Sequence, residues 1–196
     1  MQTRIVTRDD PDRQAVETMI RAVYFNRYGA WIDLFPDRLA AAFDSERNPV
    51  CAAGLRDAVT GFFSEAYIND PVEHAIAGVS GYQPDRDSVL EVTTLAGIRS
   101  GYVLQLLGFI MTDATRRGMT WGLFTATQQL RLILKRIRAP IFELAAADSA
   151  RIANAALWGS YYTTDPRVCA IAGPASGMTQ AACSLLSDTP ARPLHV

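Results

Sequence analysis

Glu65 is the first residue of the sequence whose surroundings could support acid–base chemistry. It lies in the aromatic segment 62–67, FFSEAY. A carboxylate among apolar rings has a raised pKa, and it can then accept a proton from an amine as a general base. The alternative is an exposed glutamate on a short helix, because most glutamates lie at the surface of a protein.

Glu91 is a second candidate, inside the segment 88–95, SVLEVTTL, which is rich in β-branched residues. Alternation along a strand places Glu91 and Thr93 on the same face. A charged side chain in a central strand needs a partner or a role. Glu91 is therefore expected either to contact a substrate or to pair with an arginine.

Hydroxyl-bearing aromatic residues gather in the segment 158–162, WGSYY. Such side chains can line a pocket, and a tyrosine hydroxyl such as that of Tyr161 or Tyr162 can donate a proton to a leaving group. The alternative is core packing with the hydroxyls at the rim of the core.

Basic residues dominate the segment 114–142, which contains no aspartate or glutamate. Gln128, Arg131, Lys135 and Arg138 are spaced i, i+3, i+7 and i+10, which places them on one stripe of a helix. Such a stripe can bind phosphates. The alternative is a solvated helix face that keeps the protein soluble.

Composition limits the classes of protein to consider. The 196 residues fit one domain, expected over residues 1–172 with a C-terminal tail over 173–196, and 49% of them are hydrophobic, which suffices for a core. A formal net charge of −1 argues against general nucleic-acid binding. Three separated cysteines and no signal-like start favour a reducing, cytoplasmic location. The longest apolar stretch, 103–111, is too short to span a bilayer.

Hydrophobic periodicity predicts alternating helices and strands around these residues. Strand–helix–strand alternation over residues 88–146 favours parallel strands joined by a right-handed crossover, and therefore an α/β fold. The first expected helix begins at Asp10-Pro11 and ends near Gly29. Four further helices are expected over residues 72–77, 103–117, 128–138 and 148–158. The expected strands cover 38–43, 50–55, 88–95, 120–125, 141–146 and 166–172.

At these residues the sequence resembles the thermostable hemolysin family, whose members look like GNAT acyltransferases and acyl-homoserine-lactone synthases. The chain differs from the family pattern in having Thr93-Thr94 where Gly-Asn is usual, and Ser64 where leucine is usual. The matching segments are Tyr28-Gly29-Ala30, Phe35-Pro36, 53–58 (AGLRDA), Glu65 with Tyr67-Ile68, 70–73 (DPVE), Glu91-Val92 with Leu95-Ala96, Trp121 with 124–127 (FTAT), and 158–162.

The resemblance implies a GNAT-like central mixed β-sheet flanked by helices. Its cleft would lie where the parallel strands 88–95 and 120–125 splay apart. The expected activity is that of an N-acyltransferase, which moves an acyl or aminoacyl group from a carrier to an amine of a small molecule. The turn 96–101, AGIRSG, lacks the spacing with which such enzymes usually bind coenzyme A. Aminoacyl-tRNA, acyl-carrier protein and acyl-CoA therefore all stay open as donors, and no tightly bound cofactor is expected.

Roles in this reaction are assigned as follows. Glu65 is the general base, Thr94 polarises the carbonyl, and Tyr161 or Tyr162 protonates the leaving group. No residue is predicted to bind a metal or a membrane. Substrate is expected to contact Tyr67, Glu91, Thr93, Leu95, Trp121, Thr125 and Thr127. Donor phosphates are expected to contact Arg99, Arg131, Lys135 and Arg138.

Two alternatives to this function stay open. The first is an acyl-homoserine-lactone-type synthase with an adenosyl amine donor. The second is a non-catalytic or membrane-active, hemolysin-like protein, which would need an exposed apolar patch and should cause liposome leakage.

Overall fold

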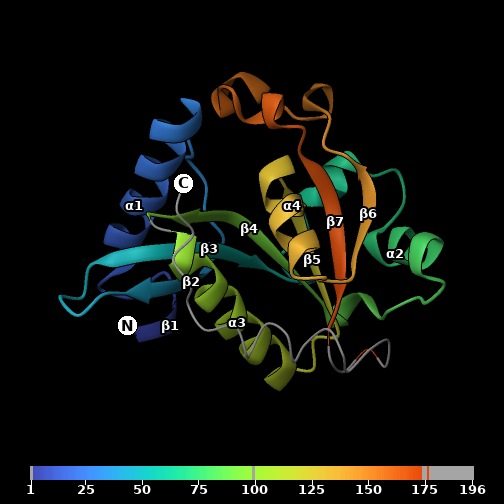
Figure 1. Cartoon of the computed structure of the whole chain (residues 1–196), viewed down its shortest axis with the longest axis horizontal. Helices are drawn as coiled ribbons and strands as arrows, with labels where there is room; N and C mark the ends of the chain where they lie inside the picture. The colour runs from blue at the N-terminus through green and yellow to red at the C-terminus, as the bar shows by residue number, and fades with distance from the viewer. Residues whose placement is uncertain (1, 99, 174–175, 177–196) are drawn as a thin grey trace.

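A seven-stranded mixed sheet runs through the part of the chain that the computed structural model describes, residues 2–98, 100–173 and 176 (Figure 1). The strand order is β1-β2-β3-β4-β5-β7-β6, and only the central pair β4–β5 is parallel. The predicted α/β fold with a central mixed sheet is confirmed. The strands are β1 (Gln2–Val6), β2 (Arg38–Phe43), β3 (Pro49–Arg56), β4 (Val89–Gly97), β5 (Trp121–Ala126), β6 (Ile141–Ala146) and β7 (Arg167–Ala172).

Helices cover both faces of this sheet. The crossovers from β4 to β5 and from β5 to β6 run in the same direction, so their right-handedness places both connecting helices on one face. The other face is covered by the first two helices and by a short 3-10 helix, η1 (Phe63–Tyr67). The α-helices are α1 (Arg13–Tyr28), α2 (Val72–Ser80), α3 (Ser100–Arg116) and α4 (Gln128–Arg136).

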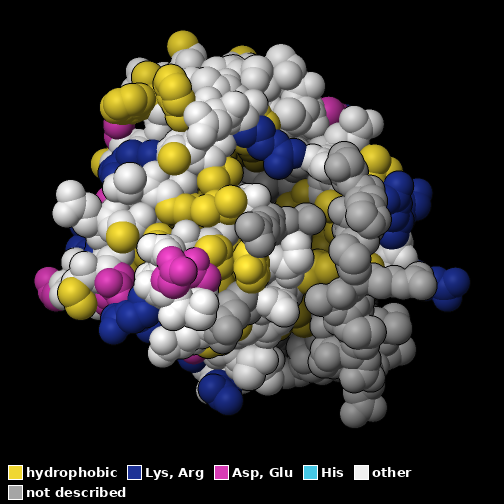
Figure 2. Space-filling model, turned by 60° about the vertical axis from the view of Figure 1, so that its left-hand side comes forward, with side chains coloured by type: hydrophobic (Ala, Val, Ile, Leu, Met, Phe, Trp, Pro, Cys, Tyr) yellow, Lys and Arg dark blue, Asp and Glu magenta, His cyan; other side chains and the backbone are white. Residues whose placement is uncertain are grey.

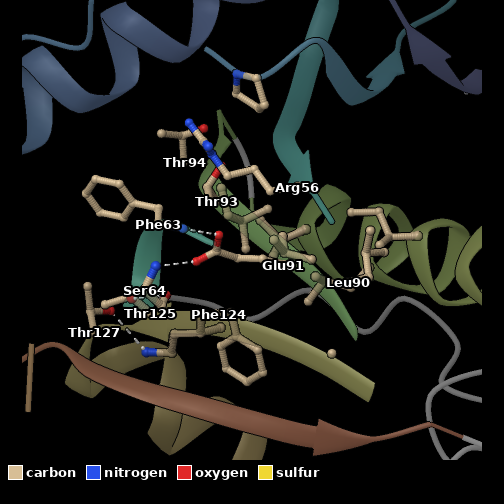
Figure 3. A pocket seen from close by; sticks show the side chains of 18 of the residues that line it. Arg56, Phe63, Ser64, Leu90, Glu91, Thr93, Thr94, Phe124, Thr125 and Thr127 are labelled. Atoms are coloured by element: carbon tan, nitrogen blue, oxygen red, sulfur yellow. Dashed lines mark hydrogen bonds between the residues drawn. The ribbon is translucent and has the colours of Figure 1, made fainter. Parts of the chain in front are cut away.

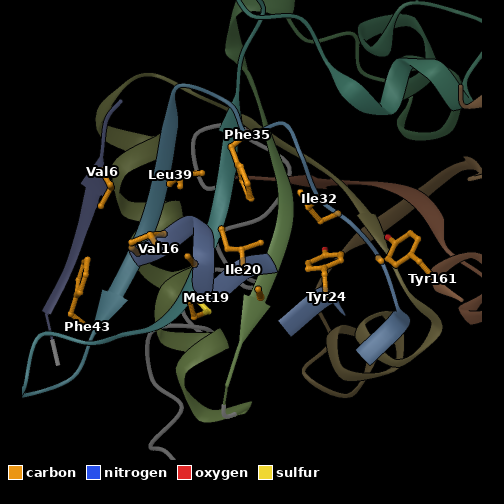
Figure 4. Packing of buried hydrophobic residues seen from close by; sticks show 14 residues of the cluster. Val6, Val16, Met19, Ile20, Tyr24, Ile32, Phe35, Leu39, Phe43 and Tyr161 are labelled. Carbon is orange, nitrogen blue, oxygen red and sulfur yellow. The ribbon is translucent and has the colours of Figure 1, made fainter. Parts of the chain in front are cut away.

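The apolar stripe of α1 builds the core on its face of the sheet. Val16, Ile20 and Tyr24 follow one another at helical spacing and are buried in one hydrophobic cluster, which also contains Leu39 of β2 (Figure 4). Gly29 ends the helix in the left-handed conformation, with φ 65°, as the sequence predicts. The last turns of the helix contribute Tyr24, Arg27 and Tyr28 to the wall of the cavity at β4 and β5 that is described below.

Strand β1 is an element that the sequence analysis missed. It is short and has one charged residue, Arg4, which pairs with Asp10 and, at 2.6 Å, with Asp12 in the turn that follows. The Asp10 carboxylate also accepts a hydrogen bond from the backbone of Asp12, so helix α1 begins at Arg13 rather than at Pro11. An edge strand can carry such charges because it pairs on one side only.

The predicted helix over 148–158 is wrong. Two short 3-10 helices lie in this range and a third follows it, because the left-handed conformation of Asn154 (φ 61°) and the positive φ of Gly159 (51°) interrupt any longer helix. They are η3 (Ser149–Arg151), η4 (Ala155–Trp158) and η5 (Tyr161–Thr164). β7 then inserts between β5 and β6, so these two strands are not hydrogen-bonded neighbours. The predicted tail, 173–196, falls almost wholly outside the described residues.

Candidate functional site

The parallel strands β4 and β5 separate at the centre of the sheet, as predicted. Their pairing runs from Val89 opposite Trp121 to Val92 opposite Phe124, and ends there. Beyond this point β4 carries one extra residue relative to β3, since Gly54 pairs with Thr93 but Ala52 pairs with Ala96. This bulge bends β4 away from β5 and opens the sheet.

A cavity of about 900 Å³ passes through this opening. On the α1 face it has a wall of aromatic and polar side chains, which we call the aromatic chamber. On the α3–α4 face its wall is almost entirely apolar, and we call it the aliphatic chamber. The aromatic chamber includes Tyr24, Tyr28, Trp31, Arg56, Ser64, Tyr67, Glu91, Thr93, Trp158 and Tyr161. The aliphatic chamber includes Leu90, Val92, Leu107, Ile110, Met111, Phe124, Leu130, Ile133, Leu134 and Ile171.

Glu91 lies where the two chambers meet, and it is fully buried. Its carboxylate accepts hydrogen bonds from the backbone N–H groups of Phe63 (2.6 Å) and Ser64 (2.7 Å) (Figure 3). These donors belong to the first turn of η1, whose N–H groups have no partner within the helix. Burial raises the pKa of Glu91, while the hydrogen bonds from Ser64 and Phe63 act in the opposite direction. A proton acceptor of raised pKa thus stands at the opening.

Two hydroxyl groups at the bulge are buried and have no hydrogen-bond partner among the described residues, those of Thr93 and Thr94. Thr94 has the left-handed φ of 45°, which is uncommon for a β-branched residue. The Thr93 side chain packs against Gly54 on the neighbouring strand. Any larger residue at position 54 would clash with it, because a Cβ there would lie 2.5 Å from the Thr93 hydroxyl oxygen. Unsatisfied groups and backbone strain in a cavity wall are typical of a binding site.

The structure does not bring Glu65 into the cavity wall. Its carboxylate forms an ion pair with Arg86 at 2.5 and 2.8 Å and accepts a hydrogen bond from the backbone of Val72. The Arg86 guanidinium lowers the pKa of Glu65, so the expectation of a raised pKa is wrong. Arg86 also contacts Glu73 at 3.0 Å, and the network joins η1 to α2. The sequence did not reveal this ion pair, because Arg86 lies 21 residues from Glu65 along the chain.

The predicted tyrosines take different positions. The hydroxyls of Tyr67 and Tyr162 are 2.7 Å apart, and Tyr67 lines the cavity. Tyr161 also lines it and packs against Tyr24, Tyr28 and Trp158. Burial raises the pKa of each of the three predicted tyrosines, so all three stay protonated near neutral pH.

The remaining residues predicted to contact substrate also line the cavity. Thr125 joins the two sides of the opening, since its hydroxyl is 3.0 Å from that of Ser64. Thr127 caps α4 by accepting a hydrogen bond from the backbone of Leu130. The lining residues of this group are Leu95, Trp121, Thr125 and Thr127.

Three of the four residues of the predicted basic stripe, Gln128, Arg131 and Lys135, lie on α4. Arg131 is held by Asp165, with a 2.7 Å ion pair, and by the Ala126 carbonyl at 3.0 Å. Lys135 is exposed, and Arg138 lies beyond the end of α4 with φ 55°. None of these three lines the cavity, and Arg99 lies outside the described residues.

Arg56 and Arg27 are the arginines that do line the cavity. Sequence reasoning missed both as site residues. The signal for Arg56 is its place at the end of an otherwise apolar strand, one residue before a turn. Arg27 could not have been found this way, because nothing in the sequence distinguishes it from the other charged residues of α1, Arg13, Glu17 and Arg21.

The mouth of the cavity has exposed apolar side chains. Trp31, Leu34 and Leu157 line the cavity and are exposed, and Figure 2 shows hydrophobic side chains lying among basic ones on one face of the molecule. Across the described residues, no helix has the length and hydropathy needed to cross a membrane.

Solved structures with the same fold include acyltransferases of several kinds. TofI in its apo form is 17% identical, with a TM-score of 0.62, covering 94% of this chain and 97% of that one. The CoA-dependent acyl-homoserine lactone synthase BjaI is 12% identical, with a TM-score of 0.62 and coverages of 94% and 86%. FeeM, an N-acyl amino acid synthase from uncultured soil microbes, is 14% identical, with a TM-score of 0.58 and coverages of 88% and 94%.

These likenesses establish the fold, which is the GNAT-like fold of acyl-homoserine-lactone synthases. No curated protein matches the sequence. The family model of thermostable hemolysin, however, matches residues 6–176. The match spans most of the chain, and the protein belongs to the thermostable hemolysin family.

Proposed function

We propose that this protein is an N-acyltransferase that moves an acyl group from a carrier to the amine of a small molecule. One observation carries the proposal: a buried carboxylate and two unpartnered hydroxyls lie at the junction of a polar and an apolar chamber. Acyl transfer needs such an arrangement, because the reacting carbonyl must lie between an apolar chain and a polar nucleophile.

Glu91 replaces Glu65 as the general base in this proposal. The amine enters through the aromatic chamber and attacks the acyl carbonyl at the opening between β4 and β5. Glu91, directly or through a water molecule, accepts the proton that the attacking nitrogen loses. Glu65 acts at a distance, since its contacts with Arg86 and Val72 hold the helix η1 whose backbone donors orient Glu91.

The hydroxyls of Thr93 and Thr94 stabilise the negative charge on the carbonyl oxygen. They need a partner, and a developing oxyanion accepts hydrogen bonds more strongly than a ground-state carbonyl. The Tyr67–Tyr162 pair is placed to return a proton to the leaving group, with Tyr67 on the cavity side. The N–C bond forms, the bond to the carrier breaks, and the carrier leaves with the tyrosine proton. The proton taken up by Glu91 is then released, and the tyrosine regains one from solvent.

The size and apolar wall of the aliphatic chamber favour a fatty acyl group over an aminoacyl group. Among the structural neighbours, BjaI is described with SAM and isopentyl-CoA. Both observations support an acyl thioester, acyl-CoA or acyl-carrier protein, as donor. The aminoacyl-tRNA hypothesis is less favoured, because Arg131 is paired with Asp165 and Arg138 lies beyond the end of α4.

The function is tested by incubating the purified chain with a panel of amines and one of three donors. The donors are decanoyl-CoA, decanoyl-carrier protein and bulk aminoacyl-tRNA, and amide products are detected by mass spectrometry. We expect a decanoyl amide with at least one thioester. An aminoacyl product would restore the tRNA hypothesis, and the absence of any amide would overturn the proposed activity.

Replacing Thr94 should separate stability from activity. Thr94→Gly removes an unsatisfied hydroxyl and the strain of the left-handed conformation, and should raise the free energy of unfolding by about 1–2 kcal/mol. Thr94→Ala keeps the Cβ and should gain less. Both variants should lose about 10²-fold in kcat, since each lacks the hydroxyl. Denaturant unfolding and steady-state kinetics measure the two effects, and unchanged kcat in Thr94→Ala would remove the hydroxyl from the mechanism.

Blocking the aliphatic chamber should shorten the preferred acyl chain. Leu107 lines this chamber from α3, and Leu107→Trp should lower kcat/KM for decanoyl-CoA by about 10- to 100-fold while leaving butyryl-CoA nearly unaffected. Leu132→Trp is the control, because Leu132 is an exposed leucine on α4 outside the cavity. Equal losses for both donors would mean that the acyl chain does not lie beside Leu107.

A further inference from the structure

Arg56 is a cavity residue that forms no ion pair with a carboxylate of the described residues, and its charge acts on Glu91 only through space. Its Nη1 donates only to the backbone oxygen of Thr60, at 3.3 Å. Other partly or largely buried arginines of the described chain, such as Arg13, Arg38 and Arg131, each pair with a carboxylate. A half-buried guanidinium without a carboxylate is available to a ligand that carries one.

Arg56 and Glu91 lie directly opposite each other on the antiparallel strands β3 and β4. Directly opposed residues have Cβ atoms about 5 Å apart and point to the same face of the sheet. No ion pair joins them, because Glu91 turns toward the backbone donors of Phe63 and Ser64 (Figure 3). The same face of the sheet therefore carries a buried carboxylate, held by two backbone donors, beside a half-buried guanidinium that contacts only one backbone oxygen.

This arrangement is complementary to an amine and a carboxylate on the same carbon atom. From this juxtaposition we propose that the acceptor is an α-amino acid or a derivative with a free carboxylate, which Arg56 binds while the amine faces Glu91. The inference rests on the proposed function and names its substrate class. The amino-acid side chain would extend toward Tyr28, Trp158 and Tyr161, which form the aromatic wall of the same chamber.

Arg27, the other arginine of the cavity wall, is less suited to this role. It is exposed, it donates to the side chain of Gln129 on α4, and it stacks on the ring of Tyr28 at 5.4 Å. A donor phosphate is a second anion that Arg56 could bind. The experiment must therefore separate a carboxylate of the acceptor from a phosphate of coenzyme A.

The test uses pairs of product analogues that differ only in the carboxylate and contain no phosphate. N-decanoyl-L-phenylalanine is compared with N-decanoyl-2-phenylethylamine, and N-decanoyl-L-leucine with N-decanoyl-3-methylbutylamine, by titration calorimetry on the full chain. We expect each acid to bind about 30-fold more tightly than its partner, the effect of a charge-assisted bidentate contact.

Arg56→Gln should reduce this ratio to near one, and Arg56→Lys should retain part of it, since lysine keeps the charge without the bidentate geometry. Arg8→Gln is the control, because Arg8 is an exposed arginine paired with Asp37 away from the cavity. Its ratio should equal that of the wild type. Thermal unfolding of each variant confirms that the fold is intact.

Three results would overturn the inference: no preference for the acid in the wild type, a preference that persists in Arg56→Gln, or no binding of either analogue. If Arg56→Gln weakens the binding of decanoyl-CoA as much as it weakens the binding of the acids, Arg56 binds the donor instead. Acyl transfer separates the two proposals. Transfer to 2-phenylethylamine as efficient as to phenylalanine overturns the carboxylate site alone, whereas no transfer to any amine overturns the proposed function.

Discussion

Glu91→Gln should reduce kcat by about 10²- to 10⁴-fold, the usual contribution of a positioned general base. Glutamine has nearly the same shape, but its carbonyl oxygen can accept only one of the two η1 hydrogen bonds, so thermal unfolding must show that the variant is folded. Steady-state kinetics with decanoyl-CoA and the best amine acceptor measure the loss. Glu65→Gln is the matched comparison, and it should lose less activity, because Glu65 lies outside the cavity and only holds η1 in place.

The pH dependence should identify Glu91 independently. Burial raises its pKa above the usual 4.5, and only the carboxylate form accepts a proton. Wild-type kcat/KM should therefore rise as the pH increases through this raised pKa, and the rise should disappear in Glu91→Gln. A variant that keeps both the rate and the pH profile of the wild type would exclude Glu91 as the base.

Glu91 should also make the stability of the folded protein depend on pH. A carboxyl group whose pKa is raised on folding stabilises the protein below its unfolded pKa, and this contribution is lost as the pH rises through the folded pKa. At neutral pH the wild type therefore holds a buried charge that glutamine does not carry. Glu91→Gln loses one of the two η1 hydrogen bonds at every pH, so its unfolding temperature relative to that of the wild type should be higher at pH 7 than at pH 4.

Gly159→Ala should destabilise the protein more than any other glycine substitution at positive φ. A Cβ at this position would lie 2.0 Å from the backbone oxygen of Tyr28 and 2.9 Å from the carbonyl carbon of Gly29. Both are backbone atoms, so no side-chain rotation relieves the overlap. We expect a loss of about 3–5 kcal/mol in the free energy of unfolding, from left-handed strain and steric overlap together.

Gly81→Ala is the matched control for this prediction. Gly81 has φ 71°, also in the left-handed region, but no atom lies within 4 Å of its Cβ position. Its replacement should cost only about 1–2 kcal/mol of conformational strain. Denaturant unfolding of both variants measures the difference, and equal losses would mean that the close approach of Gly159 to Tyr28 contributes nothing.

The close approach at Gly159 also shapes the site. Ser160 donates to the Tyr28 oxygen at 2.8 Å, and Trp31 donates to the Leu157 oxygen at 2.6 Å, so the end of α1 and the 3-10 helices are joined through their backbones. This contact sets Trp158 and Tyr161 against Tyr24. We therefore expect Gly159→Ala to weaken acceptor binding even at temperatures where it stays folded.

Local pattern alone was enough to predict most of the elements. The apolar stripe of α1, the hairpin around β2 and β3, and the strand–helix–strand unit from β4 to β5 depend on periodicities within each segment, and the structure confirms them. The placement of Glu91 and Thr93 on one face follows from alternation along a strand in the same way. The family resemblance predicted, in addition, that the parallel strands β4 and β5 separate.

Tertiary structure decided what each charged side chain contacts. Glu65 and Glu91 both lie near aromatic or β-branched residues in sequence, yet Glu65 meets Arg86 and Glu91 meets two backbone amides. The same holds for the arginines, since Arg131 is neutralised by Asp165, 34 residues away, while Arg56 faces the cavity. Helical or strand spacing predicts which face a residue occupies, but its pKa and its partners depend on elements that arrive from distant parts of the chain.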